Sequence, residues 1–150
     1  MHRLVLAVLA SLLLALPALA DAGLTIVESK RSVKDTLDAM AKALEEKGIK
    51  VVARVDHAAG AKAAGLELRP SEVLIFGSPK LGTPLMQSKP EIGIDLPMKA
   101  LAWQDASGKV FLAYTKPEAL KARYGIAGKD EVFKAMAGAL AAFTAGASGN

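Results

Sequence analysis

The sequence contains no cysteine and has few aromatic residues. Without cysteine the chain forms no disulfide bond and offers neither a thiolate metal ligand nor a cysteine nucleophile. The aromatic residues are one Trp, two Tyr and four Phe, too few for a surface on which the bases of single-stranded nucleic acid would stack. The fold must therefore be held together by packing alone.

Long runs of like charge are also missing. The chain has 19 Lys and Arg residues against 15 Asp and Glu residues, which gives a net charge of +4 at pH 7. These charges are scattered, whereas an arm or patch that binds nucleic acid needs clustered Lys and Arg. We therefore expect no nucleic-acid partner.

The N-terminal segment has the three regions of a secretory signal peptide. A short basic start is followed by the almost wholly apolar residues 4–16 and by the small-residue pattern Ala18-Leu19-Ala20. The alternative is a permanent membrane anchor, but the apolar run is shorter than the roughly 20 residues that span a bilayer. We expect residues 1–20 to be removed after Ala20, leaving a periplasmic or secreted protein without a membrane association.

The rest of the chain predicts one α+β domain at residues 21–146, followed by a flexible tail at 147–150. Apolar and β-branched segments predict strands at 24–28, 50–55, 73–76, 101–104 and 110–115. Apolar residues at helical spacing predict helices at 33–47, 85–88, 117–124 and 130–143, with a short helical turn at 58–64. Crossovers in the first half give way to a hairpin in the second, which indicates a single mixed or antiparallel sheet with helices packed mainly on one face.

Two helix starts and one helix end carry capping signals. Ser32 precedes the first apolar stripe, and Asp35 places a carboxylate in the first turn, where the helix dipole favours it. Lys47 and Gly48 follow in the order that is typical of a helix end. Asp56 has the residue type and position to cap the turn at 58–64. Residues 50–55 alternate as in a strand, so Val51, Ala53 and Val55 should share one face.

Short motifs occur in a fixed order along most of the chain. They are Asp56-His57-Ala58, Arg69-Pro70, Phe76-Gly77-Ser78-Pro79, Gly82-Thr83-Pro84-Leu85-Met86, Asp95-Leu96-Pro97, Trp103 and Arg123-Tyr124-Gly125. In this order they resemble domain-of-unknown-function family 302 (DUF302). The resemblance implies a compact domain with a curved sheet, arranged as in the TATA-binding protein, and often a dimer, but no established activity. Ser78 departs from the family pattern, which usually has asparagine there.

The stretch "IFGSPKLGTPLMQ", residues 75–87, is the best candidate for a binding site. It combines the end of an apolar strand with two glycines and two prolines, and we interpret it as a rigid loop that forms one wall of a pocket. We expect the pocket to take a small-molecule or anionic ligand. The candidate ligand-binding residues are His57, Gly77, Ser78, Pro79, Gly82, Thr83, Met86 and Asp95. The alternative for the loop is a plain tight turn, and the lysine that a phosphate-binding P-loop places after its second glycine is missing.

Other functions remain open at this level. His57 could act as the acid–base of a small enzyme, with Asp95 as its partner, or join Ser78 and Asp95 in a hydrolase triad, although no nucleophile-elbow motif surrounds Ser78. His57 with Met86 or Met98 has the residue types of a haem site, but nothing more. A lone histidine predicts no metal site, and the cofactor stays unknown. A third possibility is a structural homodimer, formed through an exposed sheet or through the small residues of the last helix.

Overall fold

The structure is a computed structural model that describes residues 22–150, so the predicted signal peptide lies outside the described residues. Its centre is one antiparallel sheet with the strand order β1-β5-β4-β3-β2. The strands are β1 (Leu24–Ser29), β2 (Lys50–Asp56), β3 (Ser71–Gly77), β4 (Met98–Gln104) and β5 (Val110–Thr115). The predicted hairpin is present as β4 and β5, which pair from Ala100 with Tyr114 to Gln104 with Val110.

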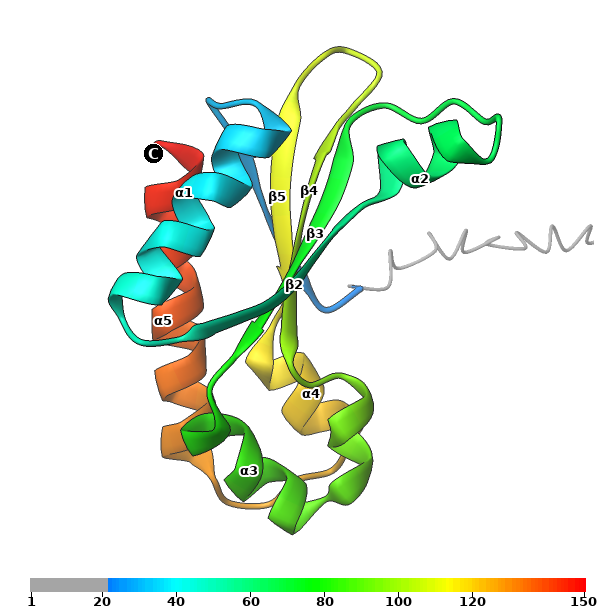
Figure 1. Cartoon of the computed structure of the whole chain (residues 1–150). Helices are drawn as coiled ribbons and strands as arrows, with labels where there is room; N and C mark the ends of the chain where they lie inside the picture. The colour runs from blue at the N-terminus through cyan, green and yellow to red at the C-terminus, as the bar shows by residue number, and fades with distance from the viewer. Residues whose placement is uncertain (1–21) are drawn as a thin grey trace, which may run out of the picture.

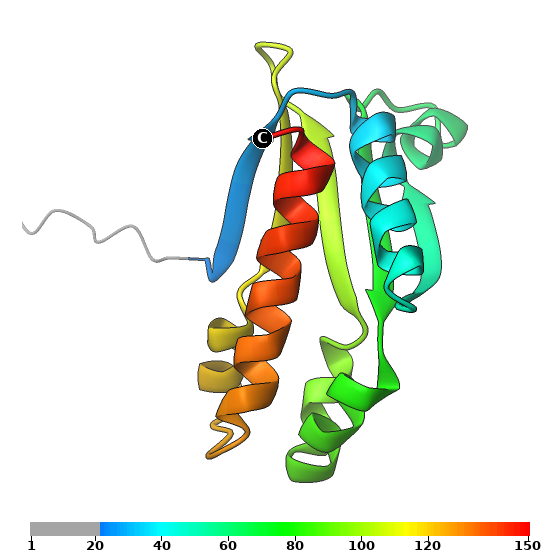
Figure 2. The ribbon, with the colours of Figure 1, turned by 90° about the vertical axis from the view of Figure 1, so that its left-hand side faces the viewer.

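Two long helices cover one face of this sheet. Helix α1 (Val33–Glu46) and helix α5 (Asp130–Ser148) lie side by side on that face, as Figures 1 and 2 show. Their buried stripes meet strand residues such as Leu74 and Leu112, which are 1% and 0% exposed. The other face carries no covering helix among the described residues. The predicted α+β class, with helices mainly on one face of a curved sheet, is confirmed.

Capping residues in the local sequence determine where helix α1 and the short helix α2 (His57–Ala63) begin. Ser32 Oγ accepts a hydrogen bond from the backbone N–H of Asp35 at 3.1 Å, as the cap prediction requires. Gly48 follows the end of α1 with a φ of +70°, a backbone conformation that favours glycine. Asp56 Oδ1 accepts from the N–H of Ala59 at 2.8 Å and so caps α2.

The residues between β3 and β4 differ most from the prediction. They form helix α3 (Pro79–Ser88), which begins well before residue 85, and a 3-10 helix η1 (Pro90–Ile94). In the sequence, Ile92, Ile94 and Leu96 alternate with less apolar residues as in a strand, but this segment forms η1 and the turn after it. Leu85 and Ile92 are both 0% exposed, so burial of these side chains stabilises helical turns in a segment rich in glycine and proline.

The predicted single face of β2 is wrong because the strand contains a bulge. Val51 pairs with Phe76 while Ala53 pairs with Ile75, so Val52 is the extra residue between them. The bulge moves the side chains after it to the other face. Val51 packs against the core, whereas Val55 is 42% exposed.

The C-terminal tail is also different from the prediction, since α5 continues through Ser148. Ala147 and Ser148 are 1% and 0% exposed. The backbone N–H of Lys30 donates to the carbonyl oxygen of Ser148 at 2.9 Å, and the Arg31 guanidinium donates to the carbonyl oxygen of Ala147 at 2.7 Å. The boundary predicted at residue 146 is therefore too early. No helix within residues 22–150 is long and apolar enough to cross a membrane.

Candidate functional site

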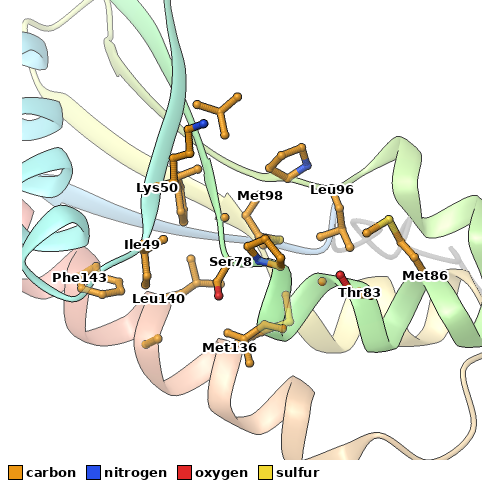
Figure 3. Close-up of a pocket in the computed structure, with 18 residues that line it drawn as sticks. Ile49, Lys50, Ser78, Thr83, Met86, Leu96, Met98, Met136, Leu140 and Phe143 are labelled. Atoms are coloured by element: carbon orange, nitrogen blue, oxygen red, sulfur yellow. The ribbon is translucent and has the colours of Figure 1, made fainter.

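A cavity of about 480 Å³ lies at one end of the sheet, where β3 leads into α3. Its walls come from the start of β2, from α3, from the connection between η1 and β4, and from α5. Figure 3 shows these side chains arranged around the space between α3 and α5. A cavity of this size is within the range of small-molecule sites.

The inner part of the cavity is apolar and well buried. Phe76 and Met98 come from β3 and β4 and are 4% and 7% exposed, and Met136 and Leu140 of α5 are 5% and 3% exposed. Phe143 extends the same stripe of α5 by one turn. Met136, Leu140 and Phe143 project from α5 at a spacing of three or four residues, so a single face of this helix supplies a continuous wall.

Helix α3 supplies the opposite wall. Pro79 occupies its first turn, where a missing N–H is harmless, and the side chain of Ser78 makes no capping hydrogen bond. Pro79, Gly82, Thr83 and Met86 all line the cavity. Gly82 does not make a sharp turn as predicted, because it lies inside the helix without a positive φ.

Gly77 has a different role at the end of β3. A Cβ atom at this position would lie 3.1 Å from Cβ of Pro97, closer than an unstrained contact. Glycine therefore permits the close approach of β3 to Pro97, and both residues line the cavity. From the sequence we expected the glycines of this segment to let the backbone approach a ligand closely, but the group next to Gly77 is Pro97 of the protein itself.

Polar groups are few around the cavity. In the described part of the chain, the lining residues with polar side chains are Lys50, Ser78 and Thr83, and none of the lining residues carries a carboxylate. Lys50 and Thr83 are exposed, whereas Ser78 is half-buried. The polar groups therefore lie toward the outside, and the buried inner end is formed by hydrocarbon and thioether groups.

His57 does not belong to this site. It is exposed at the start of α2, directly after Asp56, which pairs with Glu72 at the beginning of β3. The cavity adjoins the other end of β3 at Gly77. Five residues at about 3.3 Å per residue separate the two ends of this strand by roughly 17 Å. The structure thus contradicts the placement of His57 opposite the 77–86 segment.

Asp95 is close to the cavity but is engaged elsewhere. Its Oδ2 accepts hydrogen bonds from Tyr124 Oη at 2.6 Å and from Arg123 Nη1 at 2.8 Å. Burial alone would raise the pKa of Asp95, but these two hydrogen bonds outweigh it and hold the pKa below its ordinary value. Asp95 therefore anchors the wall residues Leu96 and Pro97 to the end of helix α4 (Pro117–Arg123) and does not line the cavity itself.

This arrangement separates the groups of the catalytic alternatives. Ser78 lines the cavity, His57 lies at the far end of β3, and Asp95 is bonded to α4, so no triad and no pair of His57 with Asp95 forms. Met86 and Met98 line the cavity without His57, which removes the proposed haem ligand pair. Gly77 ends a strand and Gly82 lies in a helix, so they form no phosphate-binding loop. Within the described part of the chain, no cluster of three His, Asp or Glu residues is placed to hold a metal ion.

Sequence reasoning missed a large part of the site. The wall from α5 was predicted only as the apolar stripe of a helix and was not connected with the pocket, and Lys50 and Val52 were not singled out. The stripe itself was a usable signal, because Met136, Leu140 and Phe143 all belong to it and all line the cavity. The position of Val52 in the lining depends on the bulge in β2, for which the sequence carries no marker.

The chain belongs to the family described as domain of unknown function DUF302, whose family model matches residues 25–143. The fold agrees with the crystal structure of an uncharacterized conserved DUF302 protein from Bacillus stearothermophilus. The TM-score is 0.74 at 18% sequence identity, and the match covers 83% of this chain and 97% of that one. That likeness shows the fold alone.

Curated relatives have a different description. The chain is 50% identical over 117 residues to fluoride-specific ion channel FluC 1 of Brucella suis, a match that covers 77% of this chain and 46% of the relative. FluC 1 of Brucella abortus matches at the same identity over 43% of its length. The chain thus spans less than half the length of these relatives.

Proposed function

We propose that this protein is a ligand-binding domain whose cavity between α3 and α5 takes a small apolar molecule. The observation that carries the proposal is the cavity itself, about 480 Å³ with an inner end formed by Phe76, Met98, Met136 and Leu140. Methionine side chains are flexible and polarisable, so they adapt to apolar ligands of different shape.

The size of the hydrophobic contribution supports measurable binding. Each buried methylene group contributes about 0.8 kcal/mol. A ligand that buries eight such groups would gain about 6 kcal/mol, which corresponds to a dissociation constant between millimolar and micromolar. Ordering of the ligand and of the cavity side chains reduces this gain, so we expect a dissociation constant nearer to millimolar than to micromolar.

The proposal is tested with a neutral fluorescent probe, 1-aminoanthracene, and with variants that fill the cavity. Ala139 lines the cavity on α5, whereas Ala141 is exposed on the same helix and does not. We expect Ala139→Phe to weaken probe binding at least tenfold, the loss of about 1.4 kcal/mol, and Ala141→Phe to leave it unchanged. Val52→Phe places a second obstruction at the exposed rim, where folding is not at risk. Equal probe binding by all variants, or none by the unmodified protein, would overturn the proposal.

A second candidate function is that of an accessory domain of an ion channel. The observation that favours it is the 50% identity, over 117 residues, to proteins named fluoride-specific ion channel. More than half of each relative lies outside the match. A domain that is joined covalently to a channel in one protein is a reasonable partner of such a channel in another.

This second function is tested with the Brucella suis relative in liposomes. One chimera carries the matched residues of this chain in place of the relative's own, and a deletion variant lacks them. Accessory function predicts that the chimera keeps the fluoride efflux rate and that the deletion lowers it. An unchanged rate in the deletion variant would exclude the role.

We further propose that the protein is exported with cleavage after Ala20. The basic start, the apolar run and Ala18-Leu19-Ala20 support this proposal. N-terminal sequencing of the protein from its native cells should begin at Asp21, and retention of Met1 in the membrane fraction would contradict export.

A further inference from the structure

The gradient of exposure around the cavity is specific enough to indicate the class of ligand. At the inner end, Phe76, Met98 and Leu140 are at most 7% exposed. At the rim, Val52 is 53% exposed, and Lys50 is also exposed. A ligand that follows this gradient has an apolar part inside and a polar part at the rim.

Lys50 gives the rim a positive charge. It is the only lining residue with a charged side chain, and no ion pair between Lys50 and a carboxylate is found within residues 22–150. Asp95, the acidic residue next to the wall in sequence, is bonded to Arg123 and Tyr124 and is therefore not available to it. The ammonium group thus remains able to pair with an anionic group of a ligand.

Hydroxyl groups complete the polar part of the lining. Thr83 projects from α3 near Leu96, and the side chain of Ser78 is not used to cap α3. Hydroxyl groups donate hydrogen bonds to carboxylate or phosphate oxygens as readily as they accept them. Among residues 22–150, the lining contains no acidic residue that would repel such a group.

We infer that the ligand is a single-chain anionic amphiphile, whose apolar chain lies between α3 and α5 and whose anionic head pairs with Lys50 at the rim. This inference rests on the proposed function, since it specifies the ligand of the same cavity. It goes beyond that function by assigning the charge of the ligand, its orientation and the residue that selects it.

The inference is tested by titration calorimetry of the domain with three probes, each below its micellar concentration or its solubility limit. Decanoate, decanol and decyltrimethylammonium share a ten-carbon chain and differ in the charge of the head. We expect decanoate to bind most tightly and to lose about fivefold in affinity in Lys50→Gln. Raising the salt concentration should weaken decanoate binding and leave decanol binding unchanged.

Lys80→Gln is the matched control, because Lys80 is an exposed lysine on α3 that does not line the cavity. It should bind decanoate like the unmodified protein. Lys50→Glu should reverse the preference in favour of decyltrimethylammonium. Equal binding of decanol and decanoate, or a Lys50→Gln variant that behaves like Lys80→Gln, would contradict the inference of an anionic ligand but not the proposal that the cavity binds apolar molecules. Failure of all three probes to bind would overturn the proposed function as well.

Discussion

Two buried threonines allow a sharp test of how polar groups contribute to the stability of this fold. Thr36 of α1 and Thr144 of α5 are 0% and 2% exposed. Thr36 Oγ1 donates to the carbonyl oxygen of Ser32 at 2.7 Å and lies 2.7 Å from Ser29 Oγ. Thr144 Oγ1 has no hydrogen-bond partner among the described residues. The same substitution should therefore have opposite effects at the two positions.

Valine has nearly the shape of threonine and a similar helix propensity, so Thr→Val isolates the hydroxyl group. A buried hydroxyl without a partner costs about 1–3 kcal/mol, so Thr144→Val should raise the free energy of unfolding by about 1–2 kcal/mol. Thr36→Val removes two hydrogen bonds and should lower the free energy of unfolding by about 1–3 kcal/mol.

The assay is thermal unfolding followed by circular dichroism, with urea titration as a second measure. For a domain of about 130 residues, 1 kcal/mol corresponds to a shift in Tm of about 4 °C. Thr144→Val should therefore melt above the unmodified protein and Thr36→Val below it. The reasoning is refuted if Thr144→Val melts lower by as much as Thr36→Val, because the hydroxyl of Thr144 would then have a stabilising partner.

Three further predictions concern the walls of the cavity and their support. Asp95→Asn should lower the free energy of unfolding by roughly 1–3 kcal/mol at pH 7, since the charged carboxylate binds Tyr124. Because the folded state lowers the pKa of Asp95, this contribution is complete above the unfolded pKa of about 3.9 and is lost as the pH falls through the folded pKa. In urea titrations, the difference in free energy of unfolding between the unmodified protein and Asp95→Asn should be smaller at pH 2 than at pH 7. An equal difference at both pH values would contradict the assignment. Gly82→Ala should stabilise α3 by about 0.5–1 kcal/mol, because alanine has a higher helix propensity than glycine. The added Cβ would meet Leu96 at 3.6 Å, an ordinary contact distance. Gly77→Ala should destabilise by about 1–3 kcal/mol through the contact that its Cβ would make at 3.1 Å, and melting temperatures in the reverse order would count against both.

The helices that the sequence predicts well are those in which local and tertiary signals agree. In α1, the Ser32 cap, the apolar stripe and Gly48 all indicate the same helix, and its bounds match the prediction within one residue. Helix α3 is the opposite case, because Pro84 removes a backbone donor from the helix interior. In the sequence, Thr83-Pro84 has the form of an N-cap followed by a first helical residue, which placed the predicted start at residue 85, but Ser78-Pro79 has the same form. The backbone N–H groups of Leu81 and Gly82 donate to the carbonyl oxygen of Ser78, so the helix starts at the earlier signal. The local sequence does not rank two signals of the same form.

The incorrect position of His57 has a topological cause. His57 and the 77–86 segment follow two strands that are consecutive in the sequence, which made proximity plausible. Since β2 and β3 are antiparallel, however, the residue after β2 lies beside the start of β3, whereas Gly77 ends it. Only the direction of pairing decides this, and neither strand carries a signal that specifies it.

The cavity was hard to predict for a similar reason. An apolar stripe on a helix can face a filled core or an empty pocket, and the pattern in the sequence is the same in both cases. Phe133 and Met136 lie on the same stripe of α5 as Leu140 and Phe143, yet Phe133 does not line the cavity. The difference arises on the opposite side, where α3 packs on η1 and the Asp95 anchor ties the end of η1 to α4. This support holds α3 at the end of the sheet and leaves space between α3 and α5. Some of the residues that create the cavity therefore do not line it. For this reason, a search of the sequence for ligand-binding side chains found the α3 wall of the cavity but not the residues that hold α3 in place.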